Sequence, residues 1–274
     1  MNMVGPEDIA HYRAHGWWLS PPVLSDDVLD TLAFGIERYR LGERDRHLAV
    51  DLGGDGETEV VAQLDYLSLQ INEFLDALLS SPVGEMAAAL AETESVRIFH
   101  DQVVIKPPFD PNRSAKVGWH SDRAYWSSCS SQSMITAWIP LEDVPEEKGP
   151  LAVWDASHTW PETETLHSFG DQDLQTIEAR FADKGHTPQV LTLPMTRGQV
   201  SFHHCRLVHG GYPNKSSEDR IAYAIHMQDD VNHYVPPAAA SGRTGHINDL
   251  LCRKTADNKP DYADPETFPQ LWPV

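Results

Sequence analysis

The segment Gly118-Trp119-His120-Ser121-Asp122 carries residue types that bind metal ions. Two residues that are two positions apart on an extended segment point to the same side, so the His120 imidazole and the Asp122 carboxylate can face one centre. With a second imidazole they would form a 2-His-1-carboxylate facial triad, which binds Fe(II) through three corners of an octahedron and leaves three corners open. Because a His-x-Asp pair also arises by chance in an acidic chain, a surface pair is the alternative.

His209 is the candidate for the second imidazole. It follows a β-type run, and the Gly210-Gly211 and Pro213-Asn214 pairs after it indicate a turn. A rigid strand end beside a tight turn holds a side chain well, which suits a metal ligand. His203 and His204 lie close by, but adjacent strand residues face opposite ways, so at most one of them points at the same centre as His209.

Arg220 and three aromatic residues are candidates for binding small molecules. Arg220 opens the apolar run 221–225, and its planar fork of donors would hold the carboxylate of a cosubstrate better than a lysine would. A surface arginine is the alternative. Tyr125, Trp126 and Trp154 lie near the motif residues and would present an aromatic wall to a bulky or ring-bearing substrate, unless they are ordinary core residues.

Composition limits the class of protein. The chain has 274 residues, of which 41% are hydrophobic and 23% charged, as is usual for a globular protein. A net charge of −20 disfavours nucleic acids and anionic membranes as partners, and it suits either a cationic substrate or solubility alone. No apolar run approaches the ~20 residues that span a bilayer, and no secretory signal is visible, so a cytoplasmic location is expected. The three cysteines are far apart, which indicates neither a disulfide framework nor a zinc knuckle.

The elements that position these residues follow from the hydrophobic pattern. Helices are expected over 6–15, about 26–40, 66–79 and 82–92, and a polar loop with glycines at 53–56 over 41–63. From residue 95 short β-type runs dominate, with one helix near 171–183, which favours a sandwich or barrel over βαβ units. We therefore expect a single domain with a helical N-terminal layer (about 1–94), a β core (95–230) and an irregular C-terminal tail (231–274). The β-type runs are 96–105, 133–139, 151–154, 190–193, 199–202 and 221–227.

The order and spacing of these motifs resemble the phytanoyl-CoA dioxygenase family of non-haem Fe(II)- and 2-oxoglutarate-dependent oxygenases. The likeness runs from the N-terminal helix and residues 16–19 to about Met227. The residues that carry it are Gln102, Lys106, 119–122, 138–151, Ser157-His158, His209 with Pro213-Asn214, and Arg220.

The resemblance implies a fold and roles for single residues. The implied fold is mainly β with flanking α-helices, a double-stranded β-helix or cupin-like jelly roll. His120, Asp122 and His209 match the iron ligands, and Arg220 matches the residue that binds the distal carboxylate of 2-oxoglutarate. Contacts to cosubstrate or substrate are expected from Gln102, Lys106 and Trp138, with a solvated lysine as the alternative for Lys106.

The implied reaction uses O2 to hydroxylate an unactivated C–H bond of a small molecule, with succinate and CO2 as coproducts. Asp122 supports this reaction, because relatives that chlorinate carry a small residue there. Secondary metabolites are among the candidate substrates, and desaturation, epoxidation or cyclisation at the same centre are alternatives. A zinc hydrolase and a non-catalytic jelly-roll binding protein are further alternatives, and the oligomeric state is open. The chain departs from the family at Lys148, usually Asn, and at Asp155-Ala156, usually Pro-Gly, which affects loop geometry.

Overall fold

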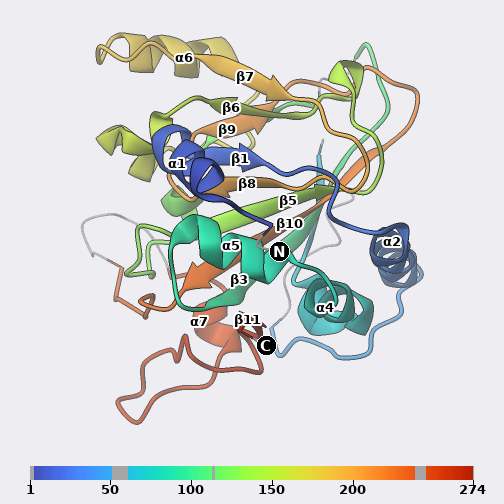
Figure 1. Cartoon of the computed structure of the whole chain (residues 1–274), viewed down its shortest axis with the longest axis vertical. Coiled ribbons are helices and arrows are strands. Elements are labelled where there is room, and N and C mark those ends of the chain that lie inside the picture. Colours follow the sequence, from blue (N-terminus) through green and yellow to red (C-terminus); the bar gives the residue numbers. More distant parts are fainter. Residues whose placement is uncertain (1–2, 51–60, 113–114, 238–244, 274) are drawn as a thin grey trace.

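The computed structural model describes residues 3–50, 61–112, 115–237 and 245–273, which form two antiparallel β-sheets with helices around them (Figure 1). The larger sheet has the order β1-β8-β5-β10-β3-β11, with β2 also paired to β3, and the smaller sheet has the order β4-β9-β6-β7. The expected mainly β fold with flanking helices is thereby confirmed. The glycine-containing segment 53–56 lies outside the described residues.

The larger sheet consists of β1 (Trp17–Leu19), β2 (Ala62–Asp65), β3 (Val96–Lys106), β5 (Ile135–Pro140), β8 (Ser201–His204), β10 (Arg220–Asp229) and β11 (Gln270–Trp272). The smaller sheet consists of β4 (Val117–His120), β6 (Leu151–Trp154), β7 (Val190–Leu193) and β9 (His209–Gly211). The helices are α1 (Pro6–His15), α2 (Asp26–Arg40), α3 (Leu67–Gln70), α4 (Asn72–Leu79), α5 (Val83–Ala91), α6 (Leu174–Ala182) and α7 (Asn248–Leu251). Short 3₁₀ turns are η1 (Asp122–Tyr125), η2 (Glu146–Lys148), η3 (Ser157–Thr159) and η4 (Pro161–Thr165).

One face of the larger sheet is apolar and lies under α2, α4 and α5 (Figure 1). Each large side chain buried there contributes about 1.5–3 kcal/mol to the free energy of folding. In the described part of the chain no single helix has the length and hydropathy to cross a bilayer, and α4 with α5 meets that test only as a pair bent by 63°. The core of this face includes Leu32, Phe74, Leu78, Met86, Val103, Tyr223 and Ile225.

The helix expected over 66–79 is interrupted at Ile71. This residue has extended backbone angles, φ −131° and ψ 118°, which separate α3 from α4. The carboxylate of Asp45 accepts a hydrogen bond of 2.9 Å from the backbone N–H of Asn72 and so caps the new helix. Strand β2 was not expected either: it begins inside the segment expected as a loop (41–63) and pairs with β3 over four residues. Both differences come from contacts distant in sequence.

The opposite face of the larger sheet carries polar side chains in cross-strand rows. His203, Thr136 and His226 are in register across β8, β5 and β10. Two positions along, Trp138 and Gln102 share a second row, and Arg220 opposes Lys106 at the end of β10. Because side chains alternate along a strand with a period of two, all of these residues point towards the smaller sheet.

The C-terminal segment is attached to the larger sheet at a β-bulge in β3. The register between β10 and β3 shifts between His226 and Met227, so that Phe99 becomes the extra residue. Asn248 donates a 2.6 Å hydrogen bond from Nδ2 to the carbonyl oxygen of Phe99. The segment expected as an irregular tail therefore contains α7 and β11, and it packs on the bulge. The Phe99 ring packs with Trp126, Cys252, Tyr262 and Phe268.

Gly118 lies where β4 meets the loop that follows η4. A Cβ atom at this position would come within 1.9 Å of the carbonyl oxygen of Ser168 and 2.7 Å of that of Asp171. The Gly118 N–H also donates a 2.7 Å hydrogen bond to the Phe169 carbonyl. A side chain would thus push the loop away from the strand that carries His120.

We expect Gly118→Ala to lower the free energy of unfolding by about 3 kcal/mol and the melting temperature by roughly 6–12 °C, because the added methyl group meets backbone atoms. Thermal unfolding followed by circular dichroism measures this. Gly170→Ala in the same loop is the matched control, since a Cβ there has nothing within 4 Å. Equal melting temperatures of the two variants would contradict the prediction.

Candidate metal centre and adjoining cavities

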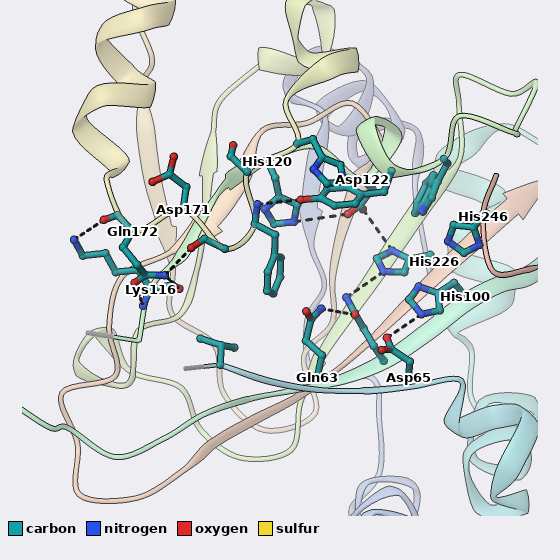
Figure 2. Close-up of a pocket in the computed structure, with 18 residues that line it drawn as sticks. Gln63, Asp65, His100, Lys116, His120, Asp122, Asp171, Gln172, His226 and His246 are labelled. Atoms are coloured by element: carbon teal, nitrogen blue, oxygen red, sulfur yellow. Dashed lines mark hydrogen bonds and ion pairs between the residues drawn. The ribbon is translucent and has the colours of Figure 1, made fainter. Parts of the chain in front are cut away.

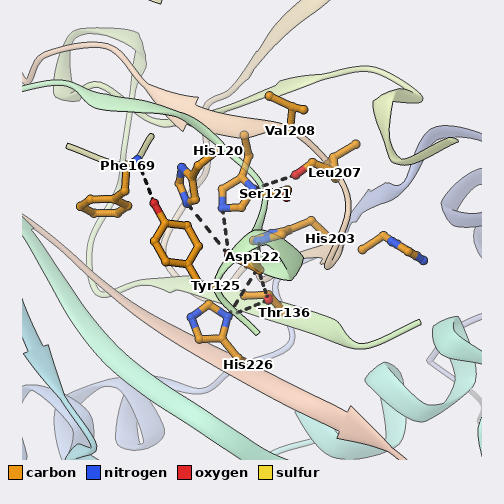
Figure 3. Close-up of polar contacts among 12 residues, drawn as sticks. His120, Ser121, Asp122, Tyr125, Thr136, Phe169, His203, Leu207, Val208 and His226 are labelled. Atoms are coloured by element: carbon orange, nitrogen blue, oxygen red, sulfur yellow. Dashed lines mark hydrogen bonds and ion pairs between the residues drawn. The ribbon is translucent and has the colours of Figure 1, made fainter. Parts of the chain in front are cut away.

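The structure brings His120, Asp122 and His209 together between the two sheets. Figure 3 shows how His120 and Asp122 lie in this site. His120 ends β4 and pairs directly with His209, the first residue of β9, while Asp122 opens η1. The Oδ1 atom of Asp122 lies 4.0 Å from Nε2 of His120 and 3.5 Å from Nε2 of His209. All three residues are buried, and their nearest ligand atoms lie within 4.8 Å of one another. This donor set is the one that Fe(II) takes in facial-triad sites.

The two imidazoles are already oriented as metal ligands. Nδ1 of His120 donates to the Gly118 carbonyl at 2.8 Å, and Nδ1 of His209 donates to the Leu207 carbonyl at 3.0 Å. With the proton on Nδ1, Nε2 of each ring presents its lone pair to Asp122. Burial lowers the pKa of His120 to about 3 and that of His209 to about 4, so both rings are neutral at pH 7.

Asp122 is held as a carboxylate. Burial by itself would raise its pKa, but the contacts with His226 and His209 outweigh this, so that its pKa lies well below the ordinary value. The hydroxyl of Thr136 donates to Oδ2 at 2.6 Å. This leaves Oδ1 as the oxygen that faces the two imidazoles.

His203 and His204 divide as the strand alternation requires. The His203 ring lies 4.3 Å from the His209 ring, and its Nε2 is 3.3 Å from Oδ2 of Asp122. The His204 ring points the other way and lies 5.2 Å from the His158 ring. His203 is therefore part of the surroundings of the metal centre, and His204 is not.

Arg220 is a buried cation without an anionic partner among the described residues. Its exposed fraction is 2%, and its Nε and Nη1 atoms form no hydrogen bond in the described part of the chain. The guanidinium carbon lies 5.2 Å from the centre of the Trp138 ring. Burial lowers the pKa of Arg220 to about 10, so the group is still charged at neutral pH. An unpaired buried charge is costly, which indicates that an anion belongs beside it.

Lys106 lies next to Arg220 and is not a solvated lysine. It is 1% exposed, and its Nζ donates to the Tyr212 carbonyl at 2.6 Å and to the Gly149 carbonyl at 3.2 Å. Burial, with the nearby charge of Arg220, lowers its pKa well below the ordinary value. An ammonium group has three donors, so one remains for a further acceptor.

Two cavities meet at the metal centre. The inner one contains Arg220, Lys106 and Trp138, and the outer one has a volume of about 830 Å³ (Figure 2). Both are lined by Gln102, His120, Asp122, Phe169 and His226. The outer cavity is also lined by Val61, Gln63, Asp65, His100, Lys116, Tyr125, Trp126, His167, Ser168, Gly170, Asp171, Gln172 and His246.

The aromatic candidates divide between cavity and core. Tyr125 and Trp126 line the outer cavity, but Trp154 lines neither cavity, and its expected contact with substrate needs correction. Its fully buried ring packs 5.4 Å from that of Trp119 and 5.1 Å from that of Phe181. The reason is that Trp154 ends β6 with its side chain towards α6, on the far side of the smaller sheet.

Several cavity residues did not stand out in the sequence. Thr136 and His226 are polar residues inside the apolar runs 135–139 and 221–227, and that interruption was the available signal. Gln63 and Asp65 carried no comparable signal, because the strand β2 was not expected. The two departures from the family pattern lie in loops: Lys148 pairs with Glu142 and Glu218, and Ala156 has a positive φ of 57°.

Known proteins share this fold and part of the sequence. A bovine (Bos taurus) peroxisomal phytanoyl-CoA dioxygenase is 25% identical over 141 residues, which cover 52% of this chain and 42% of the relative. The Rattus norvegicus enzyme is 21% identical over 235 residues, 82% of this chain and 68% of the relative. The chain thus spans less than half the length of the bovine relative.

Solved structures extend the likeness to the whole fold. The non-haem alpha-ketoglutarate-dependent carbocyclase SnoK from nogalamycin biosynthesis has a TM-score of 0.73 at 24% identity, over 97% of this chain and 96% of SnoK. The epimerase SnoN in complex with Fe³⁺, alpha-ketoglutarate and nogalamycin RO has a TM-score of 0.71 at 23% identity, over 97% of each chain. The family model of phytanoyl-CoA dioxygenase (PhyH) matches residues 12–222. The chain therefore belongs to the phytanoyl-CoA dioxygenase family.

Proposed function

We propose that this protein is an Fe(II)- and 2-oxoglutarate-dependent oxygenase that hydroxylates an unactivated C–H bond of a small molecule. The observation that carries the proposal is the meeting of two imidazoles and one carboxylate beside a buried guanidinium that lacks an anion among the described residues. Family membership and the neighbours that use alpha-ketoglutarate support it. A cytoplasmic location remains a prediction.

His120, Asp122 and His209 would hold the metal, since their free Nε2 and Oδ1 atoms converge on one point. Bound Fe(II) would supply the activation of O2 and the redox chemistry that side chains lack. The overall reaction balances as substrate C–H, 2-oxoglutarate and O2 giving substrate C–OH, succinate and CO2. All three ligands are buried, so water reaches them only through the adjoining cavities, which a bound substrate would fill.

Arg220 would hold the distal carboxylate of 2-oxoglutarate. Its unpaired Nε and Nη1 atoms provide two donors in a plane, and the remaining donor of Lys106 lies at the same end of the inner cavity. Trp138 forms the wall beside the guanidinium. A zinc hydrolase would leave the buried Arg220 unexplained, so this alternative is less well supported. A non-catalytic binding protein would show no absorption that depends on Fe(II) and 2-oxoglutarate together.

The outer cavity suits a small molecule of drug size or larger, because its volume of about 830 Å³ is near the upper end for such sites. Trp126 and Phe169 provide apolar surfaces, and most other lining residues are polar. No arginine of the described chain lines it, and the single lysine, Lys116, already donates to the Gln172 carbonyl. A substrate with several phosphates, such as an acyl-CoA, is therefore disfavoured.

Asp122→Ala is expected to abolish succinate formation, because one of the three metal ligands is lost. Anaerobic titration with Fe(II) should then give no absorption band that depends on 2-oxoglutarate, whereas the wild-type protein should develop one. A wild-type protein without this band would contradict the proposed function.

Arg220→Met should raise the Kd for 2-oxoglutarate about 10- to 100-fold, since a charge-assisted hydrogen bond contributes about 1.5–3 kcal/mol. Anaerobic titration of the Fe(II)-loaded protein with 2-oxoglutarate, followed by the absorption band, measures this Kd. Arg97→Met is the matched control, because Arg97 lies on β3 outside both cavities. An unchanged Kd in Arg220→Met would remove Arg220 from its assigned role.

Phytanoyl-CoA is expected not to be hydroxylated, because the described residues that line the outer cavity include one lysine and no arginine for its phosphates. A mass-spectrometric screen of CoA-free small molecules should instead reveal a product that forms only with Fe(II), 2-oxoglutarate and O2 together. The mass change separates hydroxylation and epoxidation, which each add one oxygen, from desaturation and cyclisation, which each remove two hydrogens. Turnover of phytanoyl-CoA would refute the charge argument.

A further inference from the structure

The second oxygen of Asp122 is surrounded by three side chains from one cross-strand row. Oδ2 accepts from the Thr136 hydroxyl at 2.6 Å and lies 3.3 Å from Nε2 of His203 and 3.5 Å from Nδ1 of His226. Thr136 on β5 is in register with His203 on β8 and with His226 on β10. The larger sheet thus delivers three polar groups to one carboxylate oxygen (Figure 3).

The hydrogen bonds of this row have a single consistent direction. An ionised carboxylate only accepts, so the Thr136 hydroxyl donates to Asp122 and must itself accept from Nδ1–H of His226, at 2.8 Å. His226 is then protonated on Nδ1, and its Nε2 is an acceptor. Nε2 of Gln102 lies 3.5 Å from that atom and donates to it.

The series of hydrogen bonds continues, in the same direction, to the wall of the outer cavity. Oε1 of Gln102 accepts a 2.6 Å hydrogen bond from Nε2 of Gln63, a residue of β2 that lines the outer cavity (Figure 2). Four donors in series therefore point towards Asp122: Gln63, Gln102, His226 and Thr136. Hydrogen bonds aligned in this way polarise and strengthen one another.

We propose that this chain of hydrogen bonds, which we name the Gln63–Thr136 chain, positions Asp122 for metal binding by occupying Oδ2 and turning Oδ1 towards the imidazoles. Thr136 and His226 act as positioning residues, since neither reaches the three converging ligand atoms. The inference rests on the proposed function, because it assumes that Asp122 is a metal ligand. Removal of a residue that is hydrogen-bonded to a metal ligand typically weakens metal affinity about 10- to 100-fold.

The first test compares Thr136→Val, which keeps the shape but removes the hydroxyl, with Thr136→Ser, which keeps the hydroxyl. In anaerobic titrations with Fe(II) alone, Thr136→Val should bind at least about tenfold more weakly than wild type, and Thr136→Ser should bind nearly as tightly as wild type. Thr192→Val on β7, outside both cavities, is the matched control for the substitution itself. Melting temperatures establish that the variants are folded.

The second test addresses the direction of the hydrogen bonds in the Gln63–Thr136 chain. His226→Phe keeps a ring but has no donor, and His226→Asn places an amide N–H near the position of Nδ1. We expect His226→Phe to lose Fe(II) affinity as Thr136→Val does, His226→Asn to recover part of it, and the double variant Thr136→Val/His226→Phe to bind no more weakly than either single variant. Nitrogen NMR of the Zn(II)-loaded wild-type protein should show the His226 proton on Nδ1.

The outcomes separate the two proposals. If wild-type protein shows no 2-oxoglutarate-dependent absorption with Fe(II), the proposed function fails. If it shows that absorption while folded Thr136→Val binds Fe(II) as tightly as wild type, the positioning role of the chain is overturned and the proposed function stands. A His226 proton on Nε2, or additive losses in the double variant, would likewise refute the direction assigned here.

Discussion

The antiparallel pairing of His120 with His209 brings two imidazoles to one point, and the rest of the site depends on that contact. Their Nδ1 atoms donate to backbone carbonyls, so the strands themselves determine which nitrogen is free. The smaller sheet thus supplies the two imidazoles. The larger sheet supplies the side chains that contact the carboxylate of Asp122, and it also supplies Arg220 and Lys106. The geometry of the site therefore depends on how the two sheets lie against each other.

Much of this arrangement could be predicted from the sequence. The His-x-Asp spacing, the turn after His209 and the position of Arg220 at the start of an apolar run can all be read from short stretches of sequence. The alternation of side chains along a strand then indicates which of these residues share a face of the sheet. The same reasoning predicted that at most one of His203 and His204 would face the centre. Each of these inferences needs only local geometry, which a sequence displays directly.

The remainder depends on contacts that no local pattern reveals. Thr136 and His226 matter because their strands pair in one particular register, and the interruption at Ile71 arises from a cap supplied by Asp45. Trp154 was misjudged because closeness to a motif in sequence does not determine which face of a sheet a side chain occupies. Lys106 was ambiguous for a similar reason, since its burial is decided by the turns around Gly149 and Tyr212.

The bulge at Phe99 separates two parts of β3 that contact different parts of the protein. On one side of it, alternate residues face the inner cavity, while at the bulge itself the strand receives the segment around Asn248, which brings His246 to the outer cavity. That segment lies beyond residues 12–222, where the family model matches. A change in this segment would therefore alter one wall of the outer cavity while leaving the strands that carry His120 and His209 unchanged.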